Sequence, residues 1–172
     1  HPVIGTTGLL AEQIQALQQM ANEKKMGGII APNFSIGAAL MMKFAAEAVE
    51  FLPQVEIIEL HHDGKKDAPS GTAIKTAELI NAKRKTIPAK KHSEELFPGS
   101  RGANVNQIHI HSIRLPGFIA HQEVIFGGHN ETLTIRHDSI HRSAFMPGVI
   151  LACKKVIHLN HLVYGLDHLL WP

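Results

Sequence analysis

The residues most able to do chemistry are gathered in one segment, 59–73, which reads ELHHDGKKDAPSGTA. His61 and His62 titrate near neutral pH, and Lys65 adds a cation shortly after them. Two adjacent histidines on an extended segment point in opposite directions, so we expect them to have different roles. The alternative for each of these residues, taken singly, is an ordinary solvated side chain.

The end of the same segment has the pattern of a helix start. Ser70 is a suitable N-cap, and the amides of Gly71 and Thr72 would then lack helical partners. Free first-turn amides and the helix dipole favour anions, and glycine lets a ligand approach the backbone closely. Together with the histidines and the lysine, this predicts an anion pocket beside a proton donor. An ordinary helix cap after a polar loop is the alternative.

Two short turns near the start of the chain could hold part of a dinucleotide. Segments 5–8 (GTTG) and 31–34 (APNF) each follow an expected strand. A ribose or nicotinamide could lie across such adjacent loops of an α/β unit. The sequence contains no G-x-G-x-x-G pattern, so the pyrophosphate fingerprint is absent. Two purely structural turns remain the alternative.

Two histidines on one expected strand are candidate zinc ligands. His109 and His111 are two apart on an expected strand and therefore share a face, where His121, His137 or Asp138 could complete a site. No cysteine pair and no HExxH motif supports a metal. We therefore expect polar strand residues on a solvent or subunit face, and no metal site.

The elements that must position these residues follow two patterns. Residues 2–4 read as the end of a strand, a helix follows from residue 10, and 26–31 reads as a second strand. This is strand–helix–strand, the unit of a parallel sheet. A helix from Ser35, a strand over 55–60 and a helix from residue 71 come next, followed by an expected exposed loop over 84–105.

From residue 106 the period changes to two, which predicts strands in the stretches 107–113, 120–126 and 132–137. A helix is expected over 146–161, with one apolar face made by Val149, Ile150, Cys153, Val156 and Ile157. The expected fold class is α/β plus α+β. A remnant of a Rossmann-type parallel sheet would be followed by a mixed-sheet domain for substrate binding and oligomerisation.

Composition narrows the class of protein. The chain has 172 residues, a net charge of +2 and one cysteine, so an intrachain disulfide and a strong nucleic-acid footprint are excluded. No apolar run approaches the ~20 residues that span a bilayer, so we expect no membrane partner and a cytoplasmic location. Arg114, Arg136 and Arg142 could bind carboxylates but, taken singly, are expected to be surface charges.

Segment 59–73 closely resembles the E-x-H-H-x-x-K-x-D-A-P-S-G-T-A signature of the dihydrodipicolinate reductase family. The resemblance covers essentially the whole chain. GTTG and APNFSIG are similar to the family's two cofactor loops, and LVYGLDHLL is similar to its carboxyl-terminal tail. HSIRLPGFIAHQEVIFGG and LTIRHDSIHRSAFMPGV resemble its substrate-domain strands and the helix that follows.

The resemblance implies reduction of 4-hydroxy-tetrahydrodipicolinate to tetrahydrodipicolinate by NADH or NADPH, in lysine and diaminopimelate biosynthesis. His61 would be the acid/base and Lys65 the proton donor, and the cyclic dicarboxylate, or its analogue pyridine-2,6-dicarboxylate, would bind His62, Ser70, Gly71 and Thr72. The cofactor would contact Gly5, Thr6, Thr7, Ala31, Pro32, Asn33 and Phe34.

The resemblance also implies domain boundaries and an assembly. Residues 1–33 would be the incomplete end of the dinucleotide-binding domain, 34–148 the substrate-binding and oligomerisation domain, and 149–172 a helix and tail returning to the first domain. A homotetramer or dimer is expected. Because the phosphate loop is missing, we expect a truncated chain with impaired cofactor binding. The alternatives are a zinc-dependent hydrolase and a non-catalytic oligomerisation module.

Overall fold

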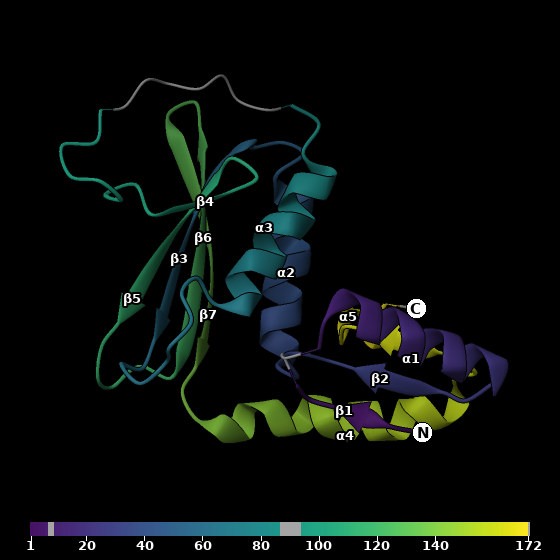
Figure 1. The fold of residues 1–172 in the computed structure, drawn as a ribbon. Coiled ribbons are helices and arrows are strands. Elements are labelled where there is room, and N and C mark those ends of the chain that lie inside the picture. Colours follow the sequence, from purple (N-terminus) through teal and green to yellow (C-terminus); the bar gives the residue numbers. More distant parts are fainter. Residues whose placement is uncertain (7–8, 87–93, 172) are drawn as a thin grey trace. The chain divides into compact units, whose positions relative to one another are not determined.

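The computed structural model describes residues 1–6, 9–86 and 94–171 and divides the chain into two compact units (Figure 1). The first unit combines His1–Ala39 with Ser143–Pro172, and the second unit is Leu40–Arg142. No helix among the described residues is both long and apolar enough to cross a membrane. Which unit serves the cofactor and which the substrate stays a prediction.

The first unit is built on a three-stranded parallel sheet in the order β1-β2-β8. Its helices and strands are β1 (Val3–Ile4), α1 (Ala11–Glu23), β2 (Gly28–Ile30), α4 (Met146–Lys155), β8 (Leu162–Tyr164) and α5 (Asp167–Leu170). The expected strand–helix–strand unit is therefore present. Strand β8 was not expected, because three residues are too few to produce a recognisable period.

Helix α4 is shorter than predicted, and its predicted apolar face is only partly buried, through Val149 and Val156. It ends at Lys155, and a 3₁₀ turn (Val156–His158) follows it. Ile150 and Ile157, both assigned to the apolar face, are 50% and 58% exposed, and the small residue Ala152 is buried instead. A Cβ on Gly148 would lie 1.9 Å from the carbonyl oxygen of Phe34. Small residues thus let this helix approach the backbone after β2.

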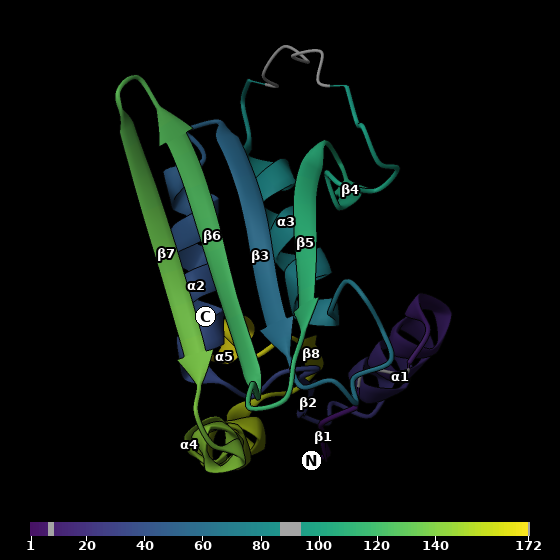
Figure 2. The same ribbon diagram turned by 90° about the vertical axis from the view of Figure 1, so that its left-hand side faces the viewer.

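The second unit holds a five-stranded mixed sheet in the order β4-β5-β3-β6-β7. Its helices and strands are β3 (Gln54–His61), α3 (Gly71–Lys83), β4 (Ala103–Val105), β5 (Ile108–Arg114), β6 (Ala120–Gly128) and β7 (Glu131–Ser139). Helix α2 (Ile36–Ala48) begins in the first unit and continues in the second. Figure 2 shows α2 and α3 on one face of this sheet, with the opposite face towards the viewer.

The core of the second unit lies between the sheet and these two helices. Alternation along each strand places one set of apolar side chains on the helix side. The buried core residues are Met41, Ala45, Val49, Val55, Ile57, Ala73, Ala77, Ile80, Ile108, Ile110, Val124 and Phe126. Strand β3 is central, parallel to β5 and antiparallel to β6, so its carboxyl end is fixed from both sides.

Two connections differ in detail from expectation. The exposed loop predicted over 84–105 ends in strand β4, which pairs antiparallel with β5, and its residues 87–93 lie outside the described part of the chain. Strands β6 and β7 both extend beyond the predicted ranges 120–126 and 132–137, so the turn between them is short. Gly128 pairs with Glu131, which leaves His129 and Asn130 as a two-residue turn, with Asn130 at φ 60°.

Candidate functional site

The residues of the predicted anion pocket lie where β3 ends and α3 begins, within the second unit. Ser70 is the N-cap, as predicted, because its Oγ accepts a hydrogen bond of 3.2 Å from the amide of Ala73. Among the residues that the structure describes, the amide of Gly71 has no hydrogen-bond partner. An added Cβ on Gly71 would meet nothing within 4 Å. This helix start is open to a ligand on the side of Gly71.

The two adjacent histidines have different environments, as their alternation predicts. The side chain of His61 is 14% exposed, and its Nδ1 lies 2.5 Å from Oε2 of Glu59. His62 is exposed. His61 is therefore held in one orientation, while the ring of His62 lies at the surface of the loop.

The cation of the motif is held by a carboxylate that the sequence analysis did not single out. Nζ of Lys65 donates to both carboxylate oxygens of Asp67, at 2.7 and 2.8 Å. The hydrogen bond from Lys65 is the main cause that lowers the pKa of the Asp67 carboxyl below its usual value. The side chain of Lys65 is only 22% exposed and has an anionic partner.

The most important site residue that the sequence did not reveal is Glu59, whose side chain is 0% exposed. It receives two hydrogen bonds from the guanidinium of Arg114, at 2.7 and 2.9 Å. The expectation that Arg114 is a surface charge is therefore wrong, since its side chain is only 17% exposed and it forms a buried bidentate pair. Arg136, by contrast, bonds Glu123 and Asp138 from an exposed position.

The environment of Glu59 keeps it ionised. Burial raises its pKa, but hydrogen bonds from His61, Arg114 and Ser112, together with the charge of Arg114, outweigh burial and lower the pKa to about 2. An ionised carboxylate therefore lies beneath the candidate site at any pH at which such an enzyme would work.

This low pKa predicts an acid-sensitive fold. A carboxyl group whose pKa is lowered on folding stabilises the folded protein at any pH above its pKa in the unfolded chain. This stability is lost as the pH falls towards the pKa of the group in the folded protein. The free energy of unfolding should thus fall between about pH 5 and about pH 2, in part because Glu59 must take up a proton. Urea unfolding measured across this range in the wild-type chain and in Glu59→Gln checks this. Equal acid slopes in both proteins would contradict it.

The predicted cofactor residues lie in the first unit. Strands β1 and β2 are parallel neighbours with Ile4 paired to Ile30, so the two turns leave the same edge of the sheet. A Cβ on Gly5 would lie 3.1 Å from the ring of Phe34, which places the two turns in contact. Gly5, Thr6 and Pro32 are exposed, while Ala31 and Phe34 are buried. Thr7 lies outside the described residues.

Asn33 has a local structural partner. Its Oδ1 accepts a hydrogen bond of 2.8 Å from the amide of Ser35, whose own Oγ accepts one of 3.2 Å from the amide of Ala38 at the start of α2. The residues present fit the nicotinamide end of a dinucleotide, because Gly5, Thr6 and Pro32 are exposed at the carboxyl ends of adjacent parallel strands. The pyrophosphate fingerprint has no counterpart in this sequence.

The strand histidines have separate partners. Nδ1 of His109 lies 2.7 Å from the carbonyl oxygen of Arg101, and Nε2 of His111 lies 2.8 Å from Oε2 of Glu56. His121 bonds a carboxylate on the neighbouring strand β7. Across residues 1–6, 9–86 and 94–171, no group of three or more metal-binding side chains is placed to hold an ion. Nothing in these contacts supports the zinc alternative.

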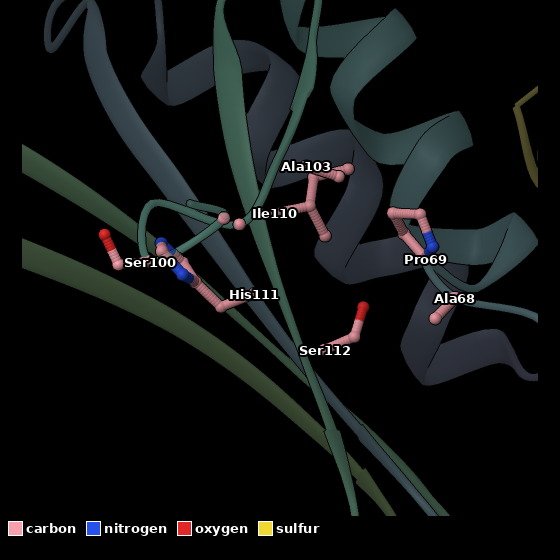
Figure 3. Close-up of a pocket in the computed structure, with 9 residues that line it drawn as sticks. Ala68, Pro69, Ser100, Ala103, Ile110, His111 and Ser112 are labelled. Carbon is pink, nitrogen blue, oxygen red and sulfur yellow. The ribbon is translucent and has the colours of Figure 1, made fainter. Parts of the chain in front are cut away.

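A groove of about 420 Å³ adjoins the motif, which contributes Ala68 and Pro69 to its lining (Figure 3). Its lining residues are Ala68, Pro69, Gly99, Ser100, Gly102, Ala103, Ile110, His111 and Ser112. It contains none of the side chains predicted to bind or protonate the substrate. The candidate site therefore rests on the β3–α3 junction rather than on this groove.

The chain is similar to known proteins over almost its whole length. Residues 37–170 match the family model described as "Dihydrodipicolinate reductase, C-terminus". The 4-hydroxy-tetrahydrodipicolinate reductase of Geobacillus kaustophilus is 59% identical over 99% of this chain and 64% of its own length. The enzyme of the same name from Legionella pneumophila (strain Philadelphia 1) is 59% identical over 99% of this chain and 70% of its own.

A solved structure is also similar to this chain. Dipicolinate-bound dihydrodipicolinate reductase from Paenisporosarcina sp. TG-14 superimposes with a TM-score of 0.85 at 51% identity, covering 97% of this chain and 63% of that one. The chain thus spans about 64% of the length of the Geobacillus relative. With a family model matched over residues 37–170, the chain belongs to the dihydrodipicolinate reductase family.

Proposed function

We propose that this chain carries the substrate site of an enzyme that reduces 4-hydroxy-tetrahydrodipicolinate to tetrahydrodipicolinate with NADH or NADPH. The observation that carries the proposal is the open helix start at Gly71, capped by Ser70 and close in sequence to Lys65 and His61. The names of the relatives and the dipicolinate bound to the Paenisporosarcina enzyme support it. Such a biosynthetic enzyme would work in the cytoplasm.

The helix start would bind one carboxylate of the ring. Backbone amides at a helix N-terminus stabilise an anion through hydrogen bonds and through the helix dipole. Gly71 and Thr72 would donate these amides, and Ser70 would hold the turn in place by its cap. His62, on the exposed loop, would contact the same substrate.

The net reaction removes the ring hydroxyl as water and adds a hydride and a proton. The reduced nicotinamide supplies the hydride when it is bound. As the hydride arrives at a conjugated ring carbon, negative charge develops on the ring, and a nearby cation stabilises it. Lys65 would donate the proton that the ring takes up. His61, held by Glu59, would be the acid/base in this proton transfer.

The cofactor would be held in part by residues of the first unit: Gly5, Thr6, Thr7, Ala31, Pro32, Asn33 and Phe34. Of these, Gly5, Thr6 and Pro32 are exposed where two parallel strands end, which suits a ribose or nicotinamide. Because the pyrophosphate fingerprint is absent from the sequence, we expect this chain alone to bind NADH or NADPH weakly.

Gly71→Ala tests the proposed carboxylate contact. Since the added methyl meets nothing within 4 Å, the fold should be unaffected and Tm should not fall. The methyl would occupy the space through which a carboxylate approaches the backbone, so the affinity for pyridine-2,6-dicarboxylate should drop about 10-fold or more, the cost of a charge-assisted hydrogen bond. Isothermal titration calorimetry measures this.

Gly127→Ala is the matched control, because its Cβ would make only an ordinary contact of 3.9 Å with Gln54, away from the site. It should bind the dicarboxylate like the wild type. Unchanged affinity in Gly71→Ala would show that the helix start is not the carboxylate site.

The face of the five-stranded sheet opposite α2 and α3 is the proposed interface with a second copy of the chain. Alternation places Ile58, Ile113 and Ile125 on this face, where Ile113 is 36% exposed. Figure 2 shows this face directly. A sheet face that mixes one exposed and two half-buried isoleucines with ion pairs is suited to a symmetric, self-complementary contact.

Sedimentation velocity should therefore find a dimer or tetramer, and Ile125→Asp should shift it towards monomer. Placing an unpaired carboxylate in an apolar contact costs several kcal/mol, roughly enough to separate the copies. Phe51→Asp, at a residue 85% exposed outside this face, is the control and should leave the assembly intact. A monomeric wild-type chain would contradict the proposal.

A further inference from the structure

Glu59 joins the parts of the candidate site that lie apart in the sequence. Its Oε2 accepts hydrogen bonds from Nδ1 of His61 at 2.5 Å and from Nη1 of Arg114 at 2.9 Å. Its Oε1 accepts from the amide of Ser70 at 3.2 Å and from Nη2 of Arg114 at 2.7 Å. Each oxygen thus receives one bond from the arginine and one from a site residue.

The arginine in this pair is itself fixed by backbone. Nη1 of Arg114 donates to the carbonyl oxygen of Ile113, and Nη2 donates to that of Asp67, both at 2.8 Å. The second bond ties the loop that carries Lys65 to strand β5. The Glu59–Arg114 pair therefore connects β3, β5, the loop of the motif and the start of α3.

The contact with His61 determines which nitrogen of the ring exchanges protons. An ionised carboxylate can only accept hydrogen bonds, so Nδ1 of His61 must carry the proton between it and Glu59. The low pKa of Glu59, about 2, supports the ionised form. Nε2 is then left to gain and lose a proton, and among the described residues it has no hydrogen-bond partner.

We propose that Glu59 is a positioning residue that holds His61 in the tautomer with the proton on Nδ1 and fixes Ser70 at the start of α3. One carboxylate would thus orient the proton-handling ring and the anion-binding helix start together. This inference rests on the proposed function for the roles of His61 and Gly71. It goes beyond that function because Glu59 would contact neither substrate nor cofactor.

The alternative, that Glu59 and Arg114 form a purely structural ion pair, predicts a different result from the positioning role. If Glu59 served only to neutralise Arg114, a folded variant without the carboxylate would leave the His61 ring and the helix start unchanged. If Glu59 positions both groups, the same variant alters the ring's tautomer and weakens binding at the helix start while the fold persists. The ring nitrogens are therefore the informative readout.

The first test is the tautomer of His61 in the wild-type chain, read from its ¹⁵N chemical shifts and long-range couplings by NMR. The expected result is a neutral ring protonated on Nδ1, with an unprotonated Nε2. A neutral ring protonated on Nε2 would overturn the proposal without any substitution. This measurement does not depend on ligand binding, so it is separate from the proposed function.

The second test compares Glu59→Gln with Glu56→Gln in the same strand. Glu56 is a matched control, because it also accepts from a histidine and an arginine, His111 and Arg101. Glu59→Gln should shift the His61 tautomer towards Nε2 and weaken pyridine-2,6-dicarboxylate binding about 10-fold, while Glu56→Gln should do neither. If Glu59→Gln fails to fold, the double variant Glu59→Gln/Arg114→Met is used instead of it, because it also removes the arginine that would be left without its carboxylate.

Wild-type tautomer and affinity in a folded Glu59 variant would overturn the positioning role. Failure of the wild-type chain to bind the dicarboxylate, with His61 protonated on Nδ1, would overturn the proposed function and support the contact described here. The two failures are thus distinguishable.

Discussion

Replacing the lysine that matches Lys65 with alanine in the full-length Geobacillus relative should lower kcat about 100-fold or more, with a much smaller rise in KM. A positioned proton donor acts mainly in the transition state, where charge develops on the ring, so its loss falls mainly on kcat. In this chain the Lys65 side chain is only 22% exposed, and its ammonium group is held by Asp67. Oxidation of the reduced nicotinamide, followed by absorbance, measures both constants.

The matched control is alanine at the position of the relative that matches Lys66, which in this chain is an exposed cation one residue after Lys65. It should leave kcat within about 2-fold of wild type, as expected for a solvated surface cation. A Lys65 variant with normal kcat and a raised KM would show that the lysine only binds substrate. A variant normal in both would contradict its place in the site.

The second large effect concerns stability. Arg114→Ala should lower the free energy of unfolding by about 3–5 kcal/mol, because it leaves the Glu59 carboxylate buried without its cation. The glutamate side chain is 0% exposed, so water cannot replace the two lost hydrogen bonds without opening the fold. Urea unfolding of the purified chain measures this difference.

Arg136→Ala is the control for this prediction. Arg136 also bonds carboxylates, those of Glu123 and Asp138, but its side chain is 48% exposed. Its removal should cost about 1 kcal/mol or less, as is usual for exposed ion pairs. A loss below 1 kcal/mol in Arg114→Ala would mean that water or another cation already compensates Glu59.

The positions of the groups nearest the motif could be predicted from the sequence. Ser70 precedes an apolar pattern and has the side chain that caps helices, so the start of α3 was predicted at Gly71. The opposite environments of His61 and His62 follow from alternation in an extended segment. These are local properties, which neighbouring residues alone determine.

The burial of Glu59 could have been predicted from its position in strand β3. Val55, Ile57 and Glu59 share one face of β3, and the first two are buried core residues. A carboxylate continuing that apolar face must have a cationic partner. The identity of the partner could not be predicted, because Arg114 is brought beside Glu59 only by the register of β3 with β5, which pairs His61 with Arg114.

The packing of α4 could not be predicted from the sequence either, because it too depends on a neighbouring element. Ile150 and Ile157 are more apolar than Gly148 and Ala152, yet the small residues are the buried ones. The neighbouring backbone comes so close that only small side chains fit, as the 1.9 Å approach at Gly148 indicates. Hydrophobicity cannot reveal such a close approach, because it depends on the partner element rather than on the helix itself.

The most direct test of the central claim is to map pyridine-2,6-dicarboxylate onto this chain by amide and histidine NMR during a titration. We predict saturable shifts at the amides of Gly71 and Thr72 and at the ring of His61, because the open helix start receives the carboxylate. The groove lined by Ser100, His111 and Ser112 should be unaffected. Shifts confined to that groove, or no saturable shifts in a folded chain, would contradict the assignment of the substrate site to the β3–α3 junction.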